Sequence, residues 1–488
     1  MSKFKLSRSL GFLTIIVLII AFSSLSMAAE QKTFRIFLPW GIVAAGQSNP
    51  MGDAFQAWFD QYTKKHPEAN LKFEFVSFNW DNHWDYLRTH AAAGDLPDVI
   101  CQRVDNGHGY VIPTPEQEAD GKSIFLSLDD FMGKTNPYTG TSLNDEYSKV
   151  ALSKARYNLK HLYYLPISQG MPALIYNEDA FKKAGIAAPP QTASELLADC
   201  AKLKGAGLTP IGGPGVAGDG SLVTYFAQYG ADSALKSWAD DITGKDPFKF
   251  DSKKYLNAFV SGSITYKDKR IKGIWDYAKK VAQYYHPATY GRDFNSIWGP
   301  FAKGDYAVMP EWSGRFIQAK AAIKNGTAQF KNYSGFSFPI VDKKAVAGSD
   351  ALKTLAGGST WGCPFSIAAD TVKRGTADAA MDFLWWWASG AQNDICWNQD
   401  QPASANGDAP PTKTAVNKWR FKDSVKFLND EYVDSRGGQL LWPNAAVGDK
   451  IYQYAKAYLM GQIKYDEFAT AADKINKAEA KTLLDQLQ

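Results

Sequence analysis

Aromatic and polar side chains follow three strands that the sequence predicts near its beginning. The tips after these strands carry Trp40, then Asn79, Trp80 and Asp81, and then Gln102 and Asp105. Indole faces cover the C–H surface of a pyranose ring, and carboxylate or amide groups bond its hydroxyls. These residues therefore indicate a site for a polyhydroxylated ligand. The alternatives are core packing for the two tryptophans and an N-cap role for Asp105.

Further candidates lie in the second half of the chain. Glu311 and Trp312 follow a strand predicted over 306–309, where a ligand would again be expected. Trp298 comes before this strand, and its alternative role is to anchor its own helix to the core. A ligand that carries phosphate would need a cation, for which Arg103 and Arg436 are the obvious candidates.

An enzymatic role would require paired carboxyl groups. Glycoside hydrolases use two of them about 5 to 10 Å apart, one with a raised pKa. Asp81, Asp105 and Glu311 could take part, but no spacing in the sequence defines such a pair. We expect a protein that is not an enzyme, with a secreted glycoside hydrolase as the alternative.

Metals, cofactors and nucleic acids are not expected as ligands. The cysteines Cys101, Cys200, Cys363 and Cys396 contain no C-x-x-C pair for zinc. Segments 120–123 and 136–145 lack the alternating carboxylates of a calcium loop. The glycine-rich segment 208–220 lacks the Lys-Ser or Lys-Thr of a phosphate loop and is interpreted as a turn near the ligand or a surface loop.

The elements that must position the first candidates alternate between strand and helix. Strands are predicted over 33–38, 71–75 and 98–101, separated by helices that bury apolar stripes. This βαβαβ order favours a mostly parallel sheet with right-handed crossovers. Ligands of such sheets bind beyond the carboxyl ends of the strands, where the candidate tips lie.

The stretch over 165–197 organises the middle of the chain. A strand is predicted over 173–176, Asn177 caps a short helix that Gly185 ends, and Thr192 with Glu195 forms a capping box for the next helix. The polar residues Ser168-Gln169-Gly170 interrupt the apolar pattern before the strand. We expect a hinge there, with Gln169 on the floor of the ligand site.

The first residues predict a signal peptide over 1–28. Lys3, Lys5 and Arg8 precede an apolar run over 11–22, and Ala28 ends a small-residue cleavage motif. The alternative is a membrane anchor, for which a run of about a dozen residues is short. The formal charge of +4 falls to about +1 without these three basic residues, so no polyanionic partner is indicated. No cysteine lies near the cleavage site, so we expect a periplasmic protein without a lipid anchor.

Four segments resemble the family 1 extracellular solute-binding proteins of ABC importers, to which the maltose-binding protein is distantly related. They are WFDQYTKKHPEANLKFEFVSF with AAAGDLPDVI, LPISQGMPALIYNEDAFKKAGIAAPPQTASELL, FAKGDYAVMPEW and LMGQIKYDEFATAADKI. Their order and spacing carry the resemblance across nearly the whole chain after residue 28. The family implies an α/β fold of two lobes, each a mainly parallel sheet flanked by helices, joined by a multi-strand hinge.

The resemblance also implies boundaries and roles. The N-terminal lobe would comprise 29–167 and 358–410, and the C-terminal lobe 168–357 and 411–488. Asp105 matches a sugar-bonding aspartate, while Trp312 and Trp442 match stacking aromatics. The second crossing between lobes would bring Gly358 and Trp361 to the site, where we also place Arg436. A Cys363–Cys396 disulfide is the preferred pairing, because the family places both segments in one lobe, and buried free thiols are the alternative.

The function that the resemblance implies is periplasmic capture of a sugar, a disaccharide or oligosaccharide, between two lobes. A monomer would then deliver this sugar to the permease subunits of an ABC transporter in the inner membrane. The alternatives are the hydrolase, a lectin-like carbohydrate-binding protein, and a phosphorylated polyol as the ligand.

Overall fold

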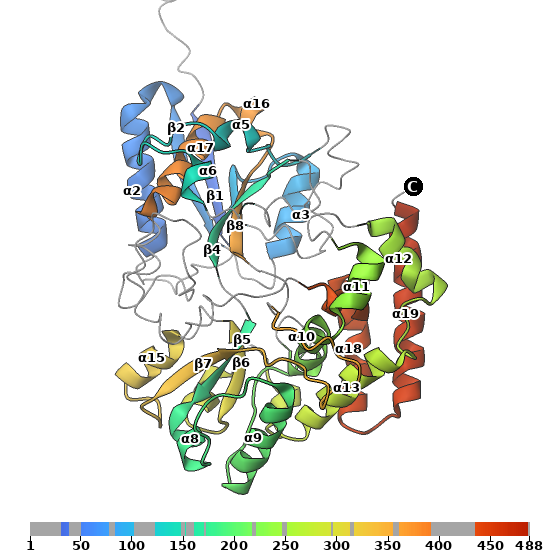
Figure 1. Cartoon of the computed structure of the whole chain (residues 1–488). Helices are drawn as coiled ribbons and strands as arrows, with labels where there is room; N and C mark the ends of the chain where they lie inside the picture. The colour runs from blue at the N-terminus through green and yellow to red at the C-terminus, as the bar shows by residue number, and fades with distance from the viewer. Residues whose placement is uncertain are drawn as a thin grey trace, which may run out of the picture.

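A computed structural model of the chain describes residues 31–38, 50–77, 83–101, 123–147, 152, 161–169, 172–216, 221–245, 251–293, 296–312, 317–354, 361–391 and 435–486. Figure 1 shows two sheets, one above the other, with a group of helices along one side. This confirms the predicted α/β fold of two lobes. The predicted signal peptide lies outside the described residues, within which no helix is long and apolar enough to cross a membrane.

The first sheet has five strands in the order β2-β1-β3-β8-β4. They are β1 (Lys32–Leu38), β2 (Leu71–Ser77), β3 (Val99–Cys101), β4 (Tyr164–Gln169) and β8 (Trp361–Ile367). The strand β1 pairs in parallel with β2 and β3, which confirms the predicted βαβαβ start. In contrast, β8 is antiparallel to both β3 and β4, because the chain returns to this sheet in the opposite direction.

Aromatic side chains pack the helices onto the first sheet. The helices are α2 (Pro50–Lys65), η1 (Pro67–Ala69), α3 (His83–Ala93), α5 (Asp129–Met132), α6 (Leu143–Glu146), α16 (Thr371–Arg374), α17 (Ala377–Trp386) and the π-helical η5 (Trp387–Ala391). The predicted stripe of α2 is buried, and its Phe55 lies edge-on to Phe383 of α17, with ring centres 5.1 Å apart. Phe383 also lies 5.1 Å from Phe365 of β8. The helix α17 thereby joins α2 to the sheet.

The second sheet has three strands in the order β6-β5-β7. They are β5 (Pro172–Asn177), β6 (Val308–Trp312) and β7 (Tyr333–Ser337). Both β6 and β7 are antiparallel to β5, so the prediction of a mainly parallel sheet is wrong for this lobe. The chain enters the sheet at Pro172 and ends β6 opposite that residue, at Trp312, which requires opposite directions. Parallel pairing here is limited to single bridges such as Ile211 with Val308.

The caps predicted after β5 are present. The Oδ1 atom of Asn177 accepts a hydrogen bond from the Ala180 N–H at 3.0 Å and caps α8 (Glu178–Lys183). Thr192 and Glu195 form the capping box of α9 (Ala193–Gly205), which buries Leu196, Cys200 and Leu203. Side chains that accept the first N–H groups of a helix favour its start at that residue.

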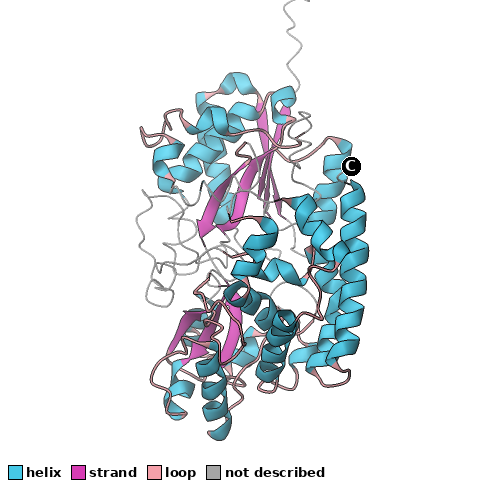
Figure 2. Ribbon diagram, turned by 45° about the vertical axis from the view of Figure 1, so that its right-hand side comes forward, coloured by secondary structure: helices cyan, strands magenta, loops and turns pink. Residues whose placement is uncertain are grey.

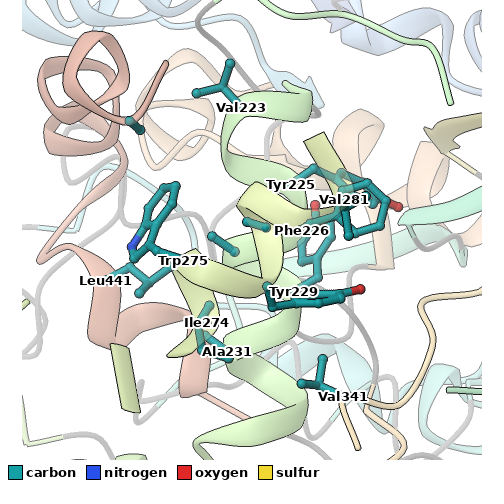
Figure 3. Close-up of a cluster of buried hydrophobic side chains, with 14 of the residues drawn as sticks. Val223, Tyr225, Phe226, Tyr229, Ala231, Ile274, Trp275, Val281, Val341 and Leu441 are labelled. Carbon is teal, nitrogen blue, oxygen red and sulfur yellow. The ribbon is translucent and has the colours of Figure 1, made fainter. Parts of the chain in front are cut away.

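A helical group completes the second lobe and is seen on one side in Figure 2. Its members and the nearby helices are α10 (Leu222–Ala234), α11 (Lys236–Thr243), α12 (Ser252–Ser261), α13 (Lys269–Ala282), η2 (Thr289–Gly291), α14 (Trp298–Ala302), α15 (Ile317–Lys324), η8 (Gly437–Leu441), α18 (Ala445–Leu459) and α19 (Tyr465–Gln486). Figure 3 shows α10 and α13 contributing Phe226, Tyr229 and Trp275 to one buried cluster. The last helix, α19, packs against α12 and α18. Tyr454 of α18 is 41% exposed.

Residues 210–215 of the glycine-rich segment do not form the surface loop that one interpretation held. Residues 210–215 are buried, and the Gly212 N–H donates to the Val308 carbonyl at 3.0 Å. A Cβ atom at Gly212 would collide with the Tyr306 ring, and one at Gly215 would collide with the Thr289 carbonyl. The glycines are needed here because the backbone lies directly against its neighbours.

We predict that Gly212→Ala lowers the free energy of unfolding by about 1–3 kcal/mol, because the added methyl group overpacks the contact with Tyr306. The matched control is Gly205→Ala in the last turn of α9, where the added methyl group meets nothing within 4 Å. This control should be neutral or raise stability by up to about 1 kcal/mol through helix propensity. Urea denaturation of both variants measures the two changes in the free energy of unfolding, and equal changes would contradict the packing argument.

Candidate functional site

The chain passes from the first sheet to the second within three residues. The strand β4 ends at Gln169 and β5 begins at Pro172, a step of at most about 11 Å. We call this step, Gln169 to Pro172, the crossing. It coincides with the polar break in the sequence, and β4 continues two residues past the predicted lobe boundary at 167.

The pairing of strands brings four of the predicted site residues to the crossing. Gln169 lies opposite Trp361 in the first sheet, and Pro172 lies opposite Trp312 in the second. Glu311 lies opposite Ala173, one residue further along β5. Paired residues of antiparallel strands have Cα atoms about 4.5–5.5 Å apart. The backbones of Gln169, Trp361, Trp312 and Glu311 thus converge, although the side chains of the first three lie outside what the structure describes.

The three N-terminal tips begin at the same edge of the first sheet, namely the edge formed by the carboxyl ends of its parallel strands. Leu38, the last residue of β1, is level with Ser77, the last residue of β2. Cys101 ends β3 and lies opposite Phe365 of β8, which also lies opposite Leu165 of β4. From that level β4 runs four residues further, about 13 Å, toward the same edge and into the crossing. This edge therefore combines the crossing with the starts of all three tips.

The residues of those tips are not described. Trp40, Asn79, Trp80, Asp81, Gln102, Asp105 and Gly358 lie outside the described residues. Their roles remain predictions that rest on where the strands before the tips end. The Cys363–Cys396 pairing is also outside, since Cys396 is not described, while the Cys101 and Cys200 side chains are buried.

Glu311 is inside β6 rather than beyond its end. The predicted strand over 306–309 ends too early, because β6 runs from Val308 through Trp312. Pro310 interrupts the expected pattern, but β6 is an edge strand, where the missing proline N–H is tolerated. Glu311 is only 3% exposed. Its Oε2 atom accepts a hydrogen bond from the Trp298 indole N–H at 3.0 Å.

Tyr225 is a residue near the crossing that the sequence did not single out. Its hydroxyl donates to the Ala173 carbonyl at 3.0 Å, so α10 is bonded to the second residue of β5. Burial raises the pKa of Tyr225 well above its usual value, so the hydroxyl stays a neutral donor. The partners are 52 positions apart, and no local pattern could have indicated their contact.

Arg436 and Trp442 are held in the helical group. Arg436 is 7% exposed and precedes η8, which lies so close to α10 that a Cβ at Gly437 would collide with the Ala231 carbonyl. That point is about 10 Å along the α10 axis from Tyr225. The Trp442 carbonyl accepts a hydrogen bond from the Tyr255 hydroxyl at 2.9 Å. These contacts join the backbone that follows Arg436 to α10 and the backbone of Trp442 to α12, and the ligand-binding roles of both side chains stay predictions.

Metal chemistry finds no support in the part of the chain that the structure describes. Within it, no group of three or more His, Cys, Asp or Glu side chains could hold a metal ion. The predicted candidates whose backbones meet at the crossing are indoles and an amide, beside the buried Glu311 carboxyl group. Indoles and amides can bind a neutral polar molecule through stacking and hydrogen bonds.

Known proteins resemble this chain in sequence and in fold. An uncharacterized ABC transporter extracellular-binding protein of Pyrococcus horikoshii is 25% identical over 304 residues, 61% of this chain and 60% of that protein. The sn-glycerol-3-phosphate-binding periplasmic protein UgpB of Yersinia enterocolitica is 51% identical, but over only 49 residues, 10% of this chain and 11% of that protein. The chain thus spans about 60% or less of the length of these relatives.

The solved structure of a chitin oligosaccharide binding protein has the same fold. Its TM-score is 0.63 at 16% sequence identity, and the match covers 93% of this chain and 100% of that one. The sequence profile of bacterial extracellular solute-binding proteins matches residues 45–393, which is well over half of the chain. The chain therefore belongs to the bacterial extracellular solute-binding protein family.

Proposed function

We propose that this chain captures a sugar, a disaccharide or oligosaccharide, and delivers it to the permease of an ABC transporter in the inner membrane. The observation that carries the proposal is that the carboxyl ends of β1, β2 and β3 and the crossing lie at one edge of the first sheet. The candidate residues predicted to follow these strands are indoles and hydrogen-bonding groups. The fold shared with a chitin oligosaccharide binding protein supports the same class of ligand.

The mechanism is closure of two lobes around the ligand. We assign 29–167 with 358–410 to one lobe, and 168–357 with 411–488 to the other. A sugar that binds both lobes at once stabilises the closed form over the open form, since it gains contacts only when both are close. The permease then distinguishes the two shapes. The protein acts as a periplasmic monomer after removal of residues 1–28.

Binding without chemistry fits the carboxyl group that the structure describes at the crossing. A glycoside hydrolase needs two carboxyl groups that reach the scissile bond. Glu311 is buried in β6 and accepts a hydrogen bond from Trp298, so it is poorly placed to donate a proton to a sugar. We therefore propose that the protein is not an enzyme.

A phosphorylated polyol is the second candidate ligand. The short segment shared with the sn-glycerol-3-phosphate-binding protein UgpB favours it. Such a ligand needs a cation in the site. Of the two candidate arginines, Arg436 is buried beside α10, and Arg103 is not described. We place the neutral sugar first for this reason.

The experiment is a calorimetric titration of the purified protein with chitotriose, raffinose, maltotriose and sn-glycerol 3-phosphate. We expect one neutral oligosaccharide to bind, and at 100 times its Kd to raise the free energy of unfolding by about 2.7 kcal/mol. Binding of glycerol phosphate alone would favour the second candidate. New reducing ends after incubation would identify a hydrolase, and binding of none of the four would contradict both ligand classes.

Trp312→Ala tests the site at the end of β6. We predict at least about tenfold weaker binding of the sugar that binds the parent, or 1.4 kcal/mol, because a stacking ring is lost. Melting curves without ligand should be nearly unchanged. Trp238→Ala on α11, whose ring lies under the Arg270 guanidinium of α13, is the control and should keep its affinity. A large loss of unliganded stability in Trp312→Ala would instead assign Trp312 to the core.

Tyr225→Phe tests the bond between α10 and the crossing. Its matched control is Tyr266→Phe, because the Tyr266 hydroxyl is equally buried and donates to the Leu441 carbonyl at 2.8 Å, within the helical group. Both variants should lose about 1 kcal/mol of stability with their hydrogen bond. Only Tyr225→Phe should weaken sugar binding, by roughly threefold. Without its bond to Ala173 the start of β5 is less fixed, and ordering it when the sugar binds costs conformational entropy. Equal affinities of the two variants would remove Tyr225 from the site.

A further inference from the structure

The pair formed by Trp298 and Glu311 lies beside the crossing. Glu311 lies opposite Ala173 on β5 and directly precedes Trp312, the residue opposite Pro172. With 3% of its surface exposed, the Glu311 side chain cannot offer its carboxyl group to a solute without a rearrangement of its surroundings. A role in direct contact with ligand, as the sequence predicted, therefore does not fit its burial.

Trp298 differs from Glu311 because its side chain is only half-buried. Its indole N–H donates to Glu311 Oε2 at 3.0 Å, and its ring meets Phe301 edge-on, with centres 6.0 Å apart and planes at 87°. These contacts hold the ring at two points. The start of its short helix is held as well, since the Tyr306 hydroxyl donates to the Ile297 carbonyl at 2.5 Å.

We propose that Glu311 is a positioning residue for sugar recognition, which fixes the plane of the Trp298 indole so that its exposed part stacks on the bound sugar. This inference rests on the proposed function and adds to it. Glu311 acts through Trp298 and does not contact the sugar. The hydrogen bond at Nε1 restricts rotation of the ring about its own side-chain bonds, which packing against Phe301 alone leaves freer.

Two physical arguments favour this role over simple core packing. A phenylalanine would fill an apolar contact beside Phe301 without a buried polar group, so the N–H to carboxyl bond serves orientation more than burial. Stacking on a sugar requires the correct ring plane, and a ring held in that plane before binding loses less conformational freedom on binding. A buried acceptor behind a partly exposed indole meets both requirements.

The test is a double-mutant cycle on sugar affinity with Trp298→Phe and Glu311→Leu. The probe is whichever of chitotriose, raffinose or maltotriose binds the parent protein most tightly. We expect about tenfold weaker binding for Glu311→Leu, as for loss of an aromatic anchor. In the Trp298→Phe background, where no N–H remains to be held, Glu311→Leu should cost less than about twofold more. If the double variant instead lost affinity by the product of the two single fold-changes, Glu311 would act on the sugar independently of Trp298, and the proposal would be wrong.

A conservative variant separates positioning from folding. Glu311→Gln keeps a carbonyl acceptor for the indole N–H and should retain most of the affinity that Glu311→Leu loses. In the free protein, the ¹H–¹⁵N signal of the Trp298 indole should shift strongly in Glu311→Leu and weakly in Glu311→Gln. If Glu311→Gln bound sugar as weakly as Glu311→Leu while keeping the parent's indole signal, the positioning role would be wrong.

Matched controls make the same chemical changes elsewhere. Glu479→Gln removes a carboxylate that accepts from Lys450 and Asn444, and Trp238→Phe alters an indole that lies under Arg270. Both should bind sugar as the parent does. A parent protein that binds none of the three sugars would overturn the proposed function and this inference together. If the parent protein binds sugar but the fold-changes of the two single variants multiply in the double variant, only this inference is overturned.

Discussion

The covalent step from Gln169 to Pro172 constrains everything around it. Strand pairing holds β4 in one sheet up to Gln169 and β5 in the other from Pro172, so the two sheets cannot separate by more than the connecting residues allow. The same pairing sets which residues flank the step, namely Trp361 on one side and Trp312 on the other. A ligand site at this position uses residues whose backbones the two sheets already hold.

Packing around the crossing gives the two faces of β5 different environments. Leu174 and Tyr176 join the cluster formed by α9, α10, α13 and the C-terminal helices. Ala173 and Ile175 belong to the cluster that also includes Phe365 of the first sheet. Apolar packing is therefore continuous from one sheet to the other on one face of β5. Any relative movement of the lobes has to rearrange side chains on that face, while the helical cluster on the other face can move as a unit.

Local signals made much of the fold predictable. Capping by Asn177 and Thr192 depends on neighbours within three residues, and the buried stripe of α2 depends on helical periodicity, so both are visible in the sequence. The polar break at Gln169 likewise indicated the crossing, because core strands are apolar. The reach of β6 was missed because Pro310 resembles a strand end, and its tolerance depends on β6 lying at a sheet edge.

Contacts between distant residues were not predictable from one sequence. The antiparallel pairing of the second sheet depends on where the chain enters and leaves it, which helix and strand spacing does not encode. The burial of Gly212 depends on Tyr306, and the role of Glu311 depends on the indole of Trp298. In each case the residue types were noticeable, but their meaning came from a partner brought near by tertiary structure.

Pro310 also bears on how this protein behaves among many copies of itself. The Val308 N–H points away from β5 and bonds the Pro210 carbonyl at 2.9 Å. Backbone N–H groups along a strand point alternately to its two sides, so the next residue of β6 whose nitrogen faces away from β5 is Pro310. Proline supplies no N–H there. The segment 210–213 covers this edge, since the Gly212 N–H also bonds the Val308 carbonyl and Gly213 lies against the Pro310 ring. The edge strand of the second sheet is thereby a poor template for intermolecular strand addition, which protects a concentrated solution of the protein from aggregation at this edge.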